Sequence, residues 1–115
     1  NKMGYRSTMI LGIAPKYKKE FEKILKEHEL DKEFELAKGH RQKDAREVEM
    51  FIYEAEYLKW YDDFGDVTDI EELIHKASED DDNAFLVGIG EDGVIHSEIG
   101  VYYDYVGIST THEIY

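Results

Sequence analysis

Cysteine is absent from this 115-residue sequence, and proline occurs once, at Pro15. The absence of cysteine excludes disulfides, thiolate zinc sites and a cysteine nucleophile, so packing and hydrogen bonds must stabilise the fold. It is also typical of proteins that work in a reducing compartment. We therefore expect an intracellular, cytoplasmic protein.

Long apolar runs are missing as well. No stretch approaches the roughly 20 apolar residues that a membrane-spanning helix requires, and no leader-like segment precedes the first expected strand. Hydrophobic residues nevertheless make up 42% of the chain, which is enough to form a core. We expect one soluble domain over residues 1–115, with no contact to a membrane.

Positive charge is scarce in the second part of the chain. Residues 1–46 carry 12 Lys and Arg against 8 Asp and Glu, whereas residues 47–115 carry 2 against 19, and the formal net charge is −13. An acidic surface repels phosphate backbones and anionic lipids, because binding of either needs basic side chains. The composition therefore predicts no direct nucleic-acid binding and favours a protein partner with a basic surface.

Hydrophobic periodicity in the first half predicts strands and one helix. Tyr5–Ala14 is rich in β-branched and apolar residues, and Pro15 suits the first turn of a helix that runs to about Leu30 with one apolar stripe. We expect a short strand over Phe34–Lys38, a polar loop, and a strand over Val48–Leu58, where residues alternate with a period of two.

The second half predicts another helix and a hairpin. Asp66 or Thr68 can cap the helix, because Thr68-Asp-Ile-Glu71 has the form of a capping box. Strands are expected over Ala84–Gly90 and Val94–Tyr105, joined by a tight turn at Asp92-Gly93, and a final strand over Ile108–Tyr115. This order predicts an α+β domain with a ferredoxin-like, split βαβ sheet of antiparallel type, with four to six strands and two helices on one face.

Two motifs suggest a ligand but lack the required context. Gly88-Ile-Gly90-Glu-Asp-Gly93 spells a dinucleotide fingerprint, yet a strand follows it where a helix is needed to meet the phosphates. The series Asp62, Asp63, Asp66 and Asp69 lacks the spacing of a calcium loop. Hairpin geometry, helix capping and solvation explain both motifs, and we expect no cofactor.

Histidine offers an alternative site near the C-terminal hairpin. By the two-residue rule His96 and Glu98 share a strand face, and His112 could approach on a neighbouring strand to hold a metal ion or act in catalysis. No nucleophile elbow and no paired-histidine helix motif occurs in the sequence. We therefore assign no catalytic residue and favour a binding protein over an enzyme, with a small-molecule or metal site at these residues as the alternative.

Aromatic and acidic residues crowd two segments. Tyr and Trp are favoured at partner interfaces because they bury a large area at low entropic cost, although alternation must turn half of each set toward the core. Trp60 could instead close the end of the sheet, with its indole N–H on a backbone acceptor. The candidate partner-binding residues are Trp60, Tyr61, Asp62, Asp63, Asp66, Tyr102, Tyr103 and Tyr105.

Two short motifs carry a resemblance. Met3-Gly4-Tyr5-Arg6-Ser7, which opens into a strand, and Leu58-Lys59-Trp60-Tyr61, which precedes acidic residues and a helix, resemble small proteins encoded in phage and prophage genomes. That class has no established activity, so the resemblance implies no catalytic residues. It implies a host protein as the partner, such as a nucleic-acid-handling or defence complex whose basic groove an acidic surface can occupy.

A third reading is self-association. The Tyr-rich C-terminal strand could pair with its copy along an open edge and give a homodimer or a homo-oligomeric structural protein.

Overall fold

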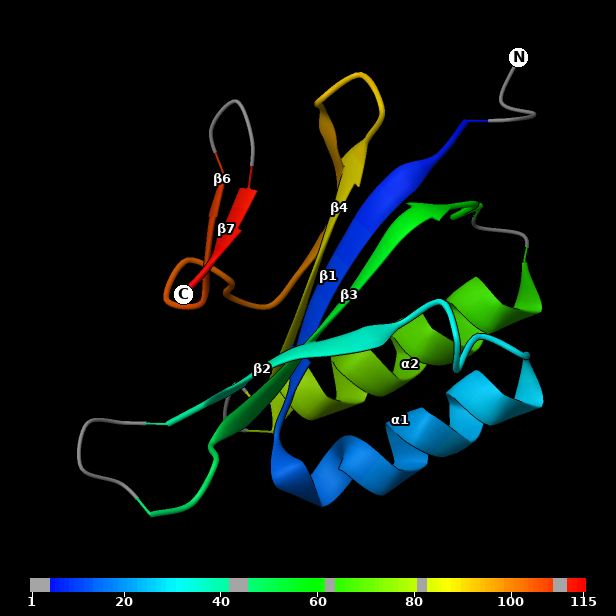
Figure 1. Cartoon of the computed structure of the whole chain (residues 1–115). Helices are drawn as coiled ribbons and strands as arrows, with labels where there is room; N and C mark the ends of the chain where they lie inside the picture. The colour runs from blue at the N-terminus through cyan, green and yellow to red at the C-terminus, as the bar shows by residue number, and fades with distance from the viewer. Residues whose placement is uncertain (1–4, 42–45, 62–63, 81–82, 109–111) are drawn as a thin grey trace.

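A computed structural model of the chain describes residues 5–41, 46–61, 64–80, 83–108 and 112–115. Its strands and helices form an α+β domain, as predicted (Figure 1). One sheet has five strands in the order β2-β3-β1-β4-β5, a second sheet consists of β6 and β7, and all pairings are antiparallel. The elements are β1 (Ser7–Ile13), α1 (Pro15–Glu27), β2 (Glu35–His40), β3 (Met50–Leu58), α2 (Gly65–Glu79), β4 (Ala84–Gly90), β5 (Ile95–Ile99), β6 (Val106–Ile108) and β7 (His112–Ile114).

The central strand β1 is buried on both faces. Met9 and Leu11 belong to the core beneath the helices, whereas Ile10 belongs to a second core on the opposite face. Because both faces are covered, the sequence of β1 is a nearly continuous apolar run and not an alternating one. The same holds for β4, in which Leu86 and Val87 point into different cores.

Both helices pack on one face of the sheet (Figure 1). The predicted apolar stripes are confirmed, since α1 buries Phe21 and Leu25 and α2 buries five apolar side chains. Trp60 lies in this core with its ring edge-on to Phe34, at a centroid distance of 6.4 Å. Within the described ranges, no helix combines the length and apolarity needed to cross a membrane. The buried residues of α2 are Val67, Ile70, Leu73, Ile74 and Ala77.

The hairpin of β6 and β7 covers the opposite face of the five-stranded sheet, which we call the hairpin side (Figure 1). Phe85 is fully buried there and stacks on Tyr105 at 5.3 Å with an interplanar angle of 8°. The His40 ring from β2 makes a T-shaped contact with Tyr105 at a centroid distance of 4.9 Å. These rings hold the C-terminal segment against the sheet and give the domain three layers.

The expected long C-terminal strands are shorter than predicted. The strand predicted over Val94–Tyr105 ends at Ile99, because Gly100 has a φ of 69° and its backbone turns away. A turn then leads into β6, and β7 covers only His112–Ile114 of the final predicted strand. This break lets the chain leave β5 at the edge of the sheet and cross to the face that β6 and β7 cover.

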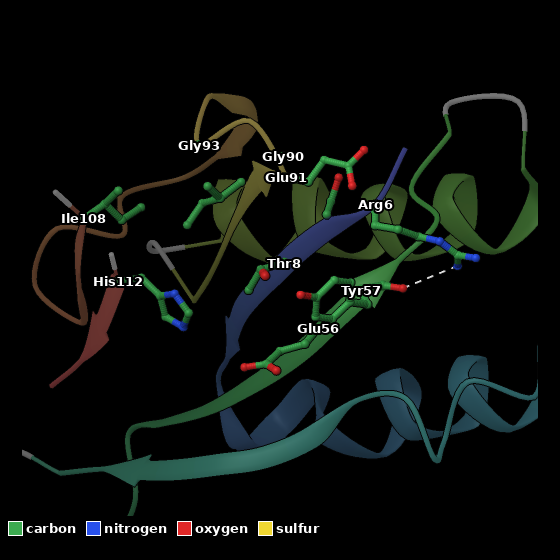
Figure 2. Close-up of a pocket in the computed structure, with 11 residues that line it drawn as sticks. Arg6, Thr8, Glu56, Tyr57, Gly90, Glu91, Gly93, Ile108 and His112 are labelled. Atoms are coloured by element: carbon green, nitrogen blue, oxygen red, sulfur yellow. Dashed lines mark hydrogen bonds between the residues drawn. The ribbon is translucent and has the colours of Figure 1, made fainter. Parts of the chain in front are cut away.

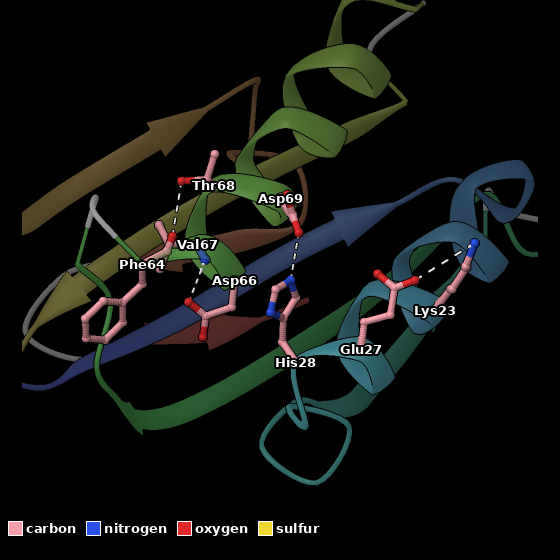
Figure 3. Close-up of polar contacts among 8 residues, drawn as sticks. All are labelled: Lys23, Glu27, His28, Phe64, Asp66, Val67, Thr68 and Asp69. Atoms are coloured by element: carbon pink, nitrogen blue, oxygen red, sulfur yellow. Dashed lines mark hydrogen bonds and ion pairs between the residues drawn. The ribbon is translucent and has the colours of Figure 1, made fainter.

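The predicted cap of α2 is wrong. The helix begins at Gly65 with Phe64 as its N-cap residue, and among the described residues no side chain caps it. Thr68 is already inside the helix, where its hydroxyl donates to the carbonyl oxygen of Phe64 at 3.1 Å (Figure 3). Asp66 Oδ1 accepts a hydrogen bond from the neighbouring Val67 N–H at 2.8 Å. The capping-box pattern at Thr68 therefore marks the first turns of the helix and not its start.

Candidate functional site

A pocket of about 450 Å³ opens between the five-stranded sheet and the β6–β7 hairpin (Figure 2). Residues from β1, β3 and the β4–β5 turn form its floor and rim, and β6 and β7 contribute one wall. A concave surface with a few convergent polar groups is typical of a ligand site. The lining residues are Arg6, Ser7, Thr8, Glu56, Tyr57, Ile89, Gly90, Glu91, Gly93, Ile108 and His112.

A β-bulge shapes the floor of this pocket. Ser7 pairs with Leu58 and Met9 pairs with Ala55, so both Glu56 and Tyr57 lie opposite the single residue Thr8. Such an extra residue bends a strand and redirects its side chains. Figure 2 shows the Glu56 carboxylate and the Tyr57 ring directed to the same side, with His112 across from them.

Tyr57 adopts an unusual backbone conformation at the bulge. Its φ is 55°, in the left-handed region that bulky residues rarely occupy. Its side chain is 76% exposed, so burial of the ring does not compensate for this conformation. Arg6 donates from Nη1 to the Tyr57 carbonyl oxygen at 3.4 Å, and Glu91 donates its backbone N–H to the Arg6 carbonyl oxygen at 2.9 Å. The pocket rim therefore presents an exposed aromatic ring on a strained residue.

The β4–β5 turn positions Glu91 at the rim. Gly93 has a φ of 81° and donates its N–H to the Gly90 carbonyl oxygen at 2.8 Å, so the Asp-Gly hairpin turn predicted from the sequence is confirmed. The Tyr5 hydroxyl donates to Asp92 Oδ1 at 2.7 Å. This hydrogen bond lowers the pKa of the Asp92 carboxyl and raises the pKa of the Tyr5 hydroxyl. Tyr5 thus ties the turn to the start of β1.

The hairpin wall is held by a polar contact at its base. His112 Nε2 contacts Glu54 Oε2, and both side chains are about three-quarters buried. Glu54 is therefore engaged within the chain. Glu56, two residues further along β3, is exposed and has no side-chain partner among the described residues.

Carboxylates without partners collect on the hairpin side. Five that lie around the pocket, on β5 and in the C-terminal segment are exposed, and within the described ranges these five make no side-chain hydrogen bond or ion pair. They extend from the pocket over the β5 strand and the C-terminal segment. Arg6, in the pocket lining, is a basic side chain on the same side. Lys38 is another, because it pairs with Ile52, whose side chain belongs to the second core. The five carboxylates are Glu56, Glu91, Glu98, Asp104 and Glu113.

Several charges on the helix side are paired, although Glu33, Glu72 and Glu79 are exposed there without a partner among the described residues. His28 Nε2 contacts Asp69 Oδ2 at 2.7 Å and links the end of α1 to α2, and Lys23 lies 3.9 Å from Glu27 (Figure 3). Lys76 reaches Glu20 across the two helices at 3.6 Å. The shallow groove of about 330 Å³ between α1 and α2 is lined by charges of both signs. The helix side therefore mixes lysines with its carboxylates, whereas the pocket and the hairpin carry carboxylates with few basic side chains.

The predicted partner-binding aromatics fall into different environments. Trp60 and Tyr102 are each 6% exposed and belong to the two cores, so they do not form part of the accessible surface. The Trp60 indole Nε1 is buried and has no acceptor in the described part of the chain, contrary to the expected backbone contact. Tyr105 is half-buried in its stack on Phe85, whereas Tyr103 is 63% exposed.

The remaining candidates lie near the start of α2. Tyr61 is half-buried, donates its hydroxyl to the Tyr5 carbonyl oxygen at 3.3 Å and packs edge-on against Phe64. Asp66 is half-buried in the first turn of α2. Asp62 and Asp63 lie outside the described residues. The structure thus does not gather the predicted set into one patch.

The histidine alternative is not assembled in the structure. Glu98 pairs with Val87, whose side chain lies on the hairpin side, but a register shift next to Ile89 places His96 on the helix side. His96 Nε2 lies 2.7 Å from the Ser7 hydroxyl. The His96 ring lies next to Gly88, on the same side as the end of the Met9 side chain. His112 lies on the hairpin side at Glu54. The bulge in β5 breaks the two-residue rule on which the prediction depended. The described part of the chain contains no group of three His, Asp or Glu side chains that could hold a metal ion.

Sequence reasoning missed the pocket because its parts look ordinary in the sequence. Glu56 and Tyr57 continue the alternation of β3, and nothing in that pattern reveals the bulge. A signal was present in Arg6, which belongs to the first motif of the resemblance. No protein-family model, curated protein or solved structure matches this chain.

Proposed function

We propose that this protein is a non-enzymatic binding protein whose hairpin side engages a basic surface on another protein. One observation carries the proposal: five exposed carboxylates on this side have no partner among the described residues and few basic side chains beside them, whereas the helix side combines its carboxylates, paired and unpaired, with several lysines. Unpaired charge is available to a partner without first breaking an internal contact.

The electrostatics favour a protein partner over nucleic acid. A surface of one sign accelerates encounter with an oppositely charged surface and repels surfaces of the same sign. Phosphate backbones need clustered basic side chains, and the pocket lining has two carboxylates, Glu56 and Glu91, against the single guanidinium of Arg6. The partner should therefore present arginine and lysine.

The source of the partner follows from the resemblance to small phage and prophage proteins. Under this proposal the protein acts in the host cytoplasm on a host protein, for example a nucleic-acid-handling or defence complex with a basic groove. The exposed acidic surface would occupy that groove in place of nucleic acid.

Affinity capture from host lysate with paired charge-reversal variants tests the proposal. The first variant changes Glu56, Glu91 and Glu113 to Lys on the hairpin side. The control changes Glu33, Glu72 and Glu79 to Lys, which are exposed residues of the helix side. Both variants change the net charge equally, so a difference between them reports the location of the interface.

We expect the wild-type chain and the control to retain a basic host protein at low salt and to release it as salt rises, because exposed charges are screened. The hairpin-side variant should lose it. Equal retention by both variants, or no captured protein at low salt, would contradict the proposal.

A homodimer through an edge strand is the second candidate. Strand β2 ends one side of the five-stranded sheet, and Leu36 on it is 51% exposed. Apolar side chains on an open edge favour pairing with another strand. Light scattering that gives the monomer mass at high micromolar concentration would exclude this candidate.

We also propose that β1 to β4 with α1 and α2 form a ferredoxin-like split βαβ core. The order β2-β3-β1-β4 with antiparallel neighbours supports this assignment. Strand β5 and the β6–β7 hairpin would then be additions to that core. An experimental structure with a different strand order would refute it.

A further inference from the structure

We infer that the pocket binds the guanidinium group of an arginine side chain, with the Tyr57 ring as the stacking surface and the Glu56 carboxylate as the acceptor. The inference rests on the proposed function, because the arginine would belong to the basic partner. It assigns the centre of the interface to the bulge in β3.

The bulge brings together the two groups that a guanidinium needs. Glu56 and Tyr57 both lie opposite Thr8, and their side chains point to the same side of the sheet (Figure 2). A guanidinium is planar, so one face can stack on an aromatic ring while its edge donates two parallel hydrogen bonds to a carboxylate. An ammonium group has no plane to stack and no such fork of donors.

The charges around the pocket favour a cation. Glu91 stands at the rim, and Glu56 has no partner among the described residues. Arg6, the basic residue of the lining, directs Nη1 to the Tyr57 carbonyl oxygen and lies beyond the ring from His112 (Figure 2). A phosphate or carboxylate ligand would meet two carboxylates, whereas an arginine meets complementary charge.

The conformation of Tyr57 supports a role for its ring. A residue with a φ of 55° is strained unless it is glycine, and a ring that is 76% exposed contributes little packing to the fold. Glycine at this position would relieve the strain and preserve the bulge. A large aromatic residue is therefore unfavourable for the isolated chain, which is expected where the ring serves a partner.

The experiment uses the full chain and two small probes, N-acetyl-arginine amide and its uncharged isostere N-acetyl-citrulline amide. Each is titrated while amide NMR signals of Thr8, Tyr57 and Gly90 are followed. We expect saturable shifts with the arginine probe at a dissociation constant of about 1 to 10 mM, as for one ring stack and one charged pair. The citrulline probe should bind at least about fivefold more weakly.

Variants assign the interaction to the named groups. Glu56→Gln and Tyr57→Ala should each weaken arginine binding by about tenfold, equivalent to one charged or stacked contact. Tyr57→Phe should retain it, and Glu72→Gln on the helix side is the charge-matched control that should leave it unchanged. Because both pocket side chains are exposed, the variants are expected to fold, and their amide spectra check this.

No saturable shift with the arginine probe, or equal binding of both probes, would overturn the inference. The capture experiment separates this failure from failure of the proposed function. If the hairpin-side variant loses its partner but the arginine probe does not bind, the acidic surface remains the interface and the pocket is not its centre. If the arginine probe binds and capture does not depend on the hairpin side, the pocket is an arginine-binding site and the proposed function is wrong.

Discussion

Replacing Gly12 with alanine should destabilise the protein through the ring stack that holds the hairpin on the sheet. Gly12 pairs with Phe85 across β1 and β4, and a Cβ atom at Gly12 would lie 2.1 Å from Cε2 of the Phe85 ring. Carbon atoms in contact are about 3.5 to 4.0 Å apart, so the ring would have to move by more than 1 Å. Phe85 is fully buried and stacked on Tyr105, so the displacement reaches the C-terminal segment.

The expected cost is about 2 to 3 kcal/mol, the upper part of the usual range for overpacking, because the ring has no free space. For a domain of this size the melting temperature should fall by roughly 8 to 15 °C. Urea unfolding followed by far-UV circular dichroism would measure the change, with an unchanged slope if the unfolded state is the same.

Gly93→Ala is the matched control. Gly93 has a φ of 81°, but nothing lies within 4 Å of its added Cβ, so only the backbone term of about 1 kcal/mol should appear. Combining Gly12→Ala with Phe85→Leu should recover part of the loss, because neighbouring substitutions couple. Equal costs for both glycines, with no coupling to Phe85, would refute the placement of this ring over β1.

Two further predictions concern α1. The hydrogen bond from Lys18 lowers the pKa of Glu22 below its ordinary value of 4.5, so the stability it contributes is fully present above that pH and is lost as pH falls through the folded value. Unfolding should therefore show Glu22→Gln to be less stable than the wild-type chain by about 0.5 kcal/mol at pH 7 and equally stable at pH 3. A loss of stability that persists at pH 3 would contradict this cause. Glu29 follows α1 with a φ of 58°, where glycine is preferred, so Glu29→Gly should raise the free energy of unfolding by about 0.5 to 1 kcal/mol in the same assay; a loss of stability would show that the Glu29 side chain contributes more than its strain costs.

Much of the fold could be predicted because periodicity reports burial. The stripes of α1 and α2 and the strands β1, β3 and β4 follow from the spacing of apolar residues. The second core was missed although its signal was present. Ile10 and Val87 are apolar at positions that would face solvent in a two-layer domain, so a layer on that face was required to cover them.

The candidate site could not be predicted, because two bulges determine it. The bulge in β3 brings Glu56 and Tyr57 to one side, and the bulge in β5 separates His96 from Glu98. A shift of one residue reverses which face a side chain occupies, yet it leaves the alternation in the sequence unchanged. Trp60 was ambiguous for a different reason, since a buried aromatic and an interface aromatic have the same signature in a single sequence.

Hydrogen exchange in the complex with the captured basic protein tests the central claim most directly. If the hairpin side is the interface, amides of residues 54–58, 89–94 and 112–115 should exchange more slowly in the complex than in the free chain, while the exposed turn at residues 31–33 after α1 stays unchanged. Protection confined to the helix side, with residues 54–58 unaffected, would contradict the account.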